Sequence, residues 1–144
     1  MSMSNGPFGG ERWSALFGAM KGLRGSWPSR GWSWDKRLSC VTSSFSAELD
    51  AKARAAAAIA LPIEWTSTTI QRASAPLRDL AERAGGLRPG QFLLVSTALD
   101  AAFAYGLWWP WGDGMTTSMR VGLGGPHATQ DALQRLRDVF AVEL

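Results

Sequence analysis

The chain has 144 residues, of which 46% are hydrophobic and 19% are charged. These values exclude an intrinsically disordered chain and allow one domain with its own core. The net charge of +3 comes from residues 1–60, which hold eight Lys or Arg against four Asp or Glu. Because this excess is small and the basic residues are scattered, the composition disfavours nucleic acid as the partner.

The N-terminal part combines a short helical pattern with an aromatic loop. Residues 11–23 are predicted to form a helix, because large apolar side chains recur there at helical spacing. Residues 25–37 have loop composition and interleave Trp with Arg and Lys. We interpret residues 1–37 as a loosely structured Trp/Arg/Gly-rich arm and residues 38–144 as an α+β domain. This interleaving is typical of a nucleic-acid or membrane contact, but because the charge excess is small we prefer a lid held by cation–π contacts within the chain, or a partner-binding segment.

One strand and two helices are predicted in the middle of the chain. The side chains of residues 37–47 are expected to alternate between the two sides of a strand. We expect Phe45 to lie on the same side as Cys40. The Ala-rich residues 48–60 favour a helix. A further helix is expected from about residue 75 to the Gly pair at 85–86, since glycine commonly ends helices.

The C-terminal half is predicted to be a three-stranded antiparallel meander followed by a helix. Its strands are residues 91–99, 103–111 and 115–123, and a Gly-Asp-Gly turn joins the last two. In the final helix, residues 128–142, we expect a buried stripe at Leu133, Leu136, Val139 and Phe140, with Gln134, Arg135, Arg137 and Asp138 facing solvent. The predicted fold is a single α+β domain, in which helices pack on an antiparallel sheet of this meander and one earlier strand.

Eight tryptophans are the most unusual feature of the composition. Trp108 and Trp109 are adjacent in a predicted strand, so their side chains must point to opposite faces of the sheet. Pro110 has no N–H for a strand ladder and predicts an edge strand or a bulge. An edge that carries exposed aromatic side chains is a plausible docking surface. The candidate binding residues are Tyr105, Trp108, Trp109 and Trp111 of this strand and Trp32, Trp34 and Arg37 of the arm.

Residue types that carry catalysis or bind metals are scarce. His127 is the only histidine and Cys40 the only cysteine, and no metal-ligand spacing occurs. We interpret His127 as an exposed residue near the start of the last helix and Cys40 as a small buried side chain. No catalytic residue, metal or cofactor is therefore assigned.

The first functional hypothesis is a non-enzymatic interaction domain, regulatory or adaptor in kind, that docks through a Trp-rich sheet edge. Its partner is another protein or a second copy of the chain in a homodimer. The alternative is a small-ligand or enzymatic domain with an aromatic pocket of Tyr105, Trp108, Trp109 and Trp111 near the Gly-rich loop 122–125. Because no apolar run approaches ~20 residues and Cys40 is alone, we expect no membrane span and a cytoplasmic protein.

Overall fold

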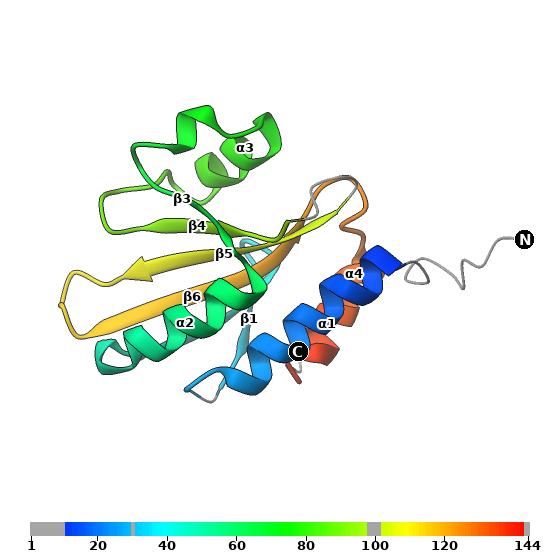
Figure 1. The fold of residues 1–144 in the computed structure, drawn as a ribbon, viewed down its shortest axis with the longest axis horizontal. Coiled ribbons are helices and arrows are strands. Elements are labelled where there is room, and N and C mark those ends of the chain that lie inside the picture. The colour runs from blue at the N-terminus through cyan, green and yellow to red at the C-terminus, as the bar shows by residue number, and fades with distance from the viewer. Residues whose placement is uncertain (1–10, 30, 98–101, 143–144) are drawn as a thin grey trace, which may run out of the picture.

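The computed structural model describes residues 11–29, 31–97 and 102–142, which form six strands and four α-helices (Figure 1). The helices are α1 (Glu11–Ser26), α2 (Asp50–Ala60), α3 (Ala75–Arg83) and α4 (Gln130–Val139), with 3₁₀ turns at Ala47–Leu49 and Ile70–Arg72. The strands are β1 (Ser33–Asp35), β2 (Cys40–Ser46), β3 (Ile63–Trp65), β4 (Phe92–Val95), β5 (Phe103–Pro110) and β6 (Thr116–Gly124).

All six strands belong to one antiparallel sheet with the order β1-β2-β6-β5-β4-β3. The predicted α+β class with an antiparallel sheet is therefore confirmed. The meander is present as β4, β5 and β6, and the turn that leads into β4 closes with a hydrogen bond from the Gln91 N–H to the Arg88 carbonyl at 2.9 Å. The sheet contains two strands that we did not predict, β1 and β3, each three residues long.

Three helices cover one side of the sheet, which we call the first face. Helix α1 contacts both α2 and α4, and α4 contacts β2 and β6. Figure 1 shows α1 and α2 side by side across the sheet. The core between them contains Met20, Ala57, Val41, Met119 and Leu136, each fully buried. Side chains alternate along β6, so Met119, Val121 and Leu123 all lie in this core.

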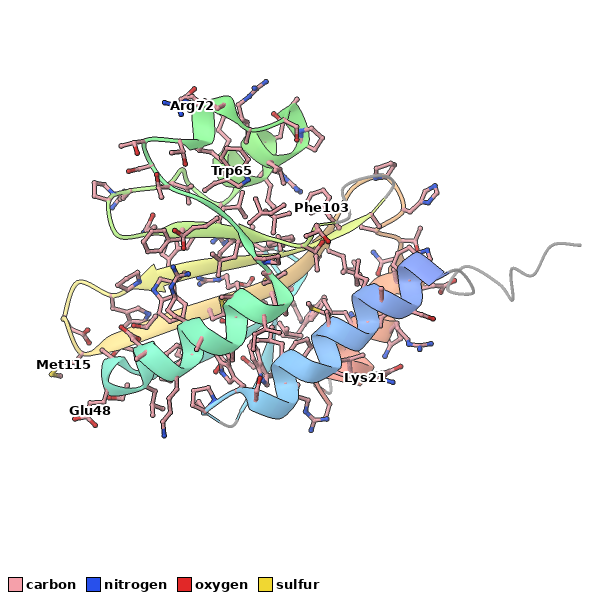
Figure 2. The ribbon with its side chains drawn as sticks, viewed as in Figure 1. Lys21, Glu48, Trp65, Arg72, Phe103 and Met115 are labelled. Atoms are coloured by element: carbon pink, nitrogen blue, oxygen red, sulfur yellow. The ribbon has the colours of Figure 1, made fainter. Side chains whose placement is uncertain are left out.

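Helix α3 lies on the opposite side, the second face, and covers only part of it. Leu77, Leu80 and Ala81 pack against Leu93 and Val95 of β4 and against residues of β5. Figure 2 shows Trp65 and Phe103 on the side of the sheet that faces α3. Apart from Leu38, which precedes β2, neither β1, β2 nor β6 contributes to this second core, so that half of the second face has no helix over it among the described residues.

Two side chains lie differently from our predictions. Phe45 shares the first face with Val41 and not with Cys40, because side chains alternate strictly along a paired strand. Arg137 is buried rather than solvent-facing, since its guanidinium lies 4.6 Å from the ring centroid of Trp34.

The N-terminal residues that the structure describes share the main core. Leu16, Phe17, Met20 and Leu23 of α1 are all buried in the first-face cluster. The members of this cluster therefore lie on both sides of the expected boundary between residues 37 and 38. Residues 1–10 lie outside the described part of the chain.

Candidate functional site

Trp108 and Trp109 point to opposite faces of β5, as their adjacency in a strand requires. Trp108 is buried in the first-face core, and the guanidinium of Arg54 lies 5.3 Å from its ring centroid. Trp109 is half-buried and packs beside the α3 core on the second face. Tyr105 is also on the second face, so these three aromatic residues and Trp111 do not line one common pocket.

The strand that carries these tryptophans is not an edge strand. Strand β5 pairs with β6 along its full length and with β4 up to the register pair Phe92–Trp108. Beyond this pair, Trp109 and Pro110 extend past Phe92, the first residue of β4. Pro110 is tolerated because it pairs with Thr117 on β6 and has no strand on its other side.

The tryptophans of residues 25–37 pack within the chain. The Trp27 indole N–H donates to the buried Ser43 hydroxyl at 3.1 Å. The ring of Trp27 lies 5.2 Å from Trp32 and 5.3 Å from Phe45, and Trp32 lies 4.6 Å from Phe140. These aromatic contacts and the Arg137–Trp34 pair are the kind that a lid held by cation–π and ring contacts requires.

The β5–β6 hairpin exposes two large apolar side chains at its tip. Of the large hydrophobic residues that the structure describes, only Ile59, Trp111 and Met115 are exposed, and the last two belong to this tip. The Asp113 carboxylate accepts hydrogen bonds from the Met115 and Thr116 amides at 2.8 and 3.0 Å, which hold the turn in one conformation. These bonds, that of the Met115 amide above all, keep the pKa of Asp113 below its usual value.

The uncovered half of the second face consists of short hydroxyl side chains, and we call it the hydroxyl face. Its members are Ser33 of β1, Thr42, Ser44 and Ser46 of β2, and Thr116 and Ser118 of β6. The Ser118 hydroxyl lies 2.7 Å from that of Ser44 and accepts the Trp111 indole N–H, also at 2.7 Å. Trp111 is therefore held over the end of this face while half of its surface remains exposed.

An ion pair lies at the other end of the hydroxyl face. The Nε of Arg120 donates to Asp35 at 3.1 Å, and the amides of Arg37 and Leu38 donate to the same carboxylate. Partial burial acts to raise the pKa of Asp35, but the Arg120 hydrogen bond and these amides together hold it below its usual value. Asp35 therefore stays charged and fixes the β1–β2 turn against β6.

A groove and a pocket lie at opposite ends of β2 and β6. The groove, about 690 Å³, borders the hairpin tip and is lined by Ser44, Ser46, Met115 and Thr116, among others. Figure 2 shows Met115 beside Glu48, another residue of its wall. The pocket, about 260 Å³, adjoins Gly124 and Gly125 of the predicted Gly-rich loop. Among the candidate binding residues, Tyr105 and Arg37 line this pocket; Arg83 of α3 also lines it and was not predicted.

Buried beside this pocket, Cys40 and Tyr105 are both poor acids. Burial raises the pKa of the Cys40 thiol to about 12, and the Asp35 carboxylate acts in the same direction. Burial also raises the pKa of Tyr105. The ring of Tyr105 covers Gly122 of β6, where a larger residue would have no space. Cys40 is thus a protonated thiol near neutral pH and not a nucleophile.

The raised pKa of Cys40 predicts a loss of stability in alkali. Between about pH 9 and pH 12 the unfolded chain releases the thiol proton and the folded protein retains it, so the free energy of unfolding falls as pH rises. Replacing Cys40→Ala should make this fall shallower in urea unfolding experiments over that range, even though the variant is less stable overall. An equally steep fall in the variant would contradict the assignment.

Other potential sites are sparse in the described residues. His127 is exposed. No group of three or more His, Cys, Asp or Glu is arranged to hold a metal ion within residues 11–29, 31–97 and 102–142. None of the helices in these ranges has the length and apolar character needed to cross a bilayer.

Comparison of the chain with protein-family models, curated proteins and solved structures finds no match.

Proposed function

We propose that this chain is a protein-interaction domain whose docking surface is the hydroxyl face together with the tip of the β5–β6 hairpin. One observation carries the proposal: Trp111 and Met115 are 50% and 68% exposed at the same hairpin tip, beside the groove formed by Ser44, Ser46 and Thr116. Tryptophan is enriched among the residues that dominate binding energy, and Trp111 is already held in place by Ser118. A side chain that is ordered before binding loses little conformational freedom on docking.

The occupant that fits this surface best is a second copy of the chain. In a two-fold symmetric dimer the same patch faces itself, so it must be complementary to itself. Hydroxyl groups both donate and accept hydrogen bonds. Asp35 and Arg120 carry opposite charges, so this ion pair adds no net charge to the hydroxyl face. We therefore infer an isologous dimer in which the two hydroxyl faces meet.

The test is the oligomeric state in solution. Light scattering coupled to gel filtration is expected to show a dimer, and Trp111→Ser should weaken it by at least tenfold in dissociation constant, because a central tryptophan contributes at least about 2 kcal/mol. Ser44→Glu should act in the same way by placing like charges near the two-fold axis. Both positions are exposed, so thermal unfolding of the monomer should change little.

Ile59→Ser supplies the matched control. Ile59 is 84% exposed on α2, on the opposite side of the sheet, and its replacement should leave the dimer intact. A wild-type protein that stays monomeric at high concentration would exclude the second copy as occupant. A dimer that survives both the Trp111 and the Ser44 substitutions would exclude this surface.

A further inference from the structure

The pocket beside Gly124 and Gly125 brings two arginines to one opening. Tyr105, Leu123 and Leu133 also line it, but each is at least nine-tenths buried, so they present little apolar surface to the opening. Arg37 follows β1, and Arg83 ends α3, so two distant segments bring their charges to one opening. The volume of about 260 Å³ is several times the roughly 30 Å³ share of a liquid water molecule, enough for a small organic molecule.

Neither arginine has its charge matched by a neighbour within the part of the chain that the structure describes. No ion pair or side-chain hydrogen bond engages the guanidinium of Arg37 or Arg83 among the described residues. Asp35, two positions before Arg37, is already engaged by Arg120 and by two backbone amides. The two positive charges at this opening repel each other, and an anion bound between them would attract both.

We propose that this pocket binds a small oxyanion whose charged group lies between Arg37 and Arg83. Guanidinium groups match carboxylate and phosphate oxygens in geometry and form strong charge-assisted hydrogen bonds with them.

This site is separate from the proposed docking surface. The pocket lies where β2 begins and β6 ends, and the hairpin groove lies at the other ends of the same strands. A monomeric protein can therefore still bind the anion, and a dimer can form with the pocket empty. The two proposals fail independently.

The experiment titrates ¹⁵N-labelled protein with benzoate, phenyl phosphate and the uncharged benzamide at constant ionic strength. The amide signals of Gly124, Gly125 and Ser39 should shift with the two anions and not with benzamide. The stronger of the two anions identifies the charged group of the ligand. Higher KCl should weaken both, because the arginines are exposed and their field is screened.

Charge-removing variants decide whether the two arginines are responsible. Arg37→Gln and Arg83→Gln should each lower the affinity about tenfold, the effect of losing one charge-assisted hydrogen bond. Arg88→Gln is the matched control: Arg88 is an exposed arginine outside this pocket, and its replacement should leave the affinity unchanged. Equal binding of benzamide and benzoate, absence of shifts with either anion, or full affinity in both Gln variants would each overturn the proposal.

Discussion

Replacing Phe140→Asp is expected to lower the free energy of unfolding by at least about 4 kcal/mol. Phe140 is 2% exposed at the end of α4, and its ring packs edge-on against Trp32 at 4.6 Å. Loss of a buried phenylalanine alone costs about 3–5 kcal/mol. The substitution also places a carboxylate in an apolar site, which adds a desolvation penalty. Because whole domains are stable by only about 5–15 kcal/mol, much of the native population could be lost.

Two comparisons separate packing from charge in this prediction. Phe140→Leu keeps an apolar side chain and should cost clearly less in urea or guanidinium unfolding. The Asp variant should regain part of its stability at acidic pH, where the carboxyl group takes up a proton in the apolar site. Thermal and chemical unfolding indistinguishable from wild type would mean that α4 is not part of the core.

The second large effect is expected from Gly122→Ala. A Cβ at this position would collide with the ring and hydroxyl of Tyr105, which lie across the strand pair β5–β6. Tyr105 is 2% exposed and cannot move away freely, so overpacking of this kind should cost about 2–3 kcal/mol. Displacement of Tyr105 would also uncover Cys40, whose reaction with a thiol reagent should become faster.

Gly112→Ala is the control for this substitution. Gly112 lies in the exposed hairpin turn, and no heavy atom is within 4 Å of the position that its Cβ would occupy. Unfolding of this variant should change by less than about 1 kcal/mol. Equal stability of the two alanine variants would contradict the close packing of Tyr105 on Gly122.

Elements with a strong local pattern could be predicted from the sequence. The apolar run of β4, the alternation in β6 and the stripe of α4 follow from local burial, so their residues carry the expected periodicity. Strands β1 and β3 were missed because three residues give no period, and both exist through pairing with a longer neighbour. The error for Pro110 has a related cause: whether a strand has neighbours on both sides depends on residues far away in sequence.

The candidate sites were harder to predict than the fold. The alternation of side chains in a strand correctly predicted that Trp108 and Trp109 lie on opposite faces of the sheet. The packing of Trp27, Trp32 and Trp34 within the chain could not be predicted in this way, because their spacing is irregular. Arg37 and Arg83 lie 46 positions apart on elements of different kinds. Both line one pocket because α3 packs back over the sheet, and no local pattern in the sequence predicts this position of α3.

The two outermost strands of the sheet are also its shortest. A long, bare strand at a sheet border lets copies add one after another into open-ended fibrils. Here β1 and β3 each offer only three residues of backbone at the border. Growth by continuation of the sheet is therefore poorly supported on either side. This property of the two borders is compatible with the closed dimer proposed above, which stops at two copies.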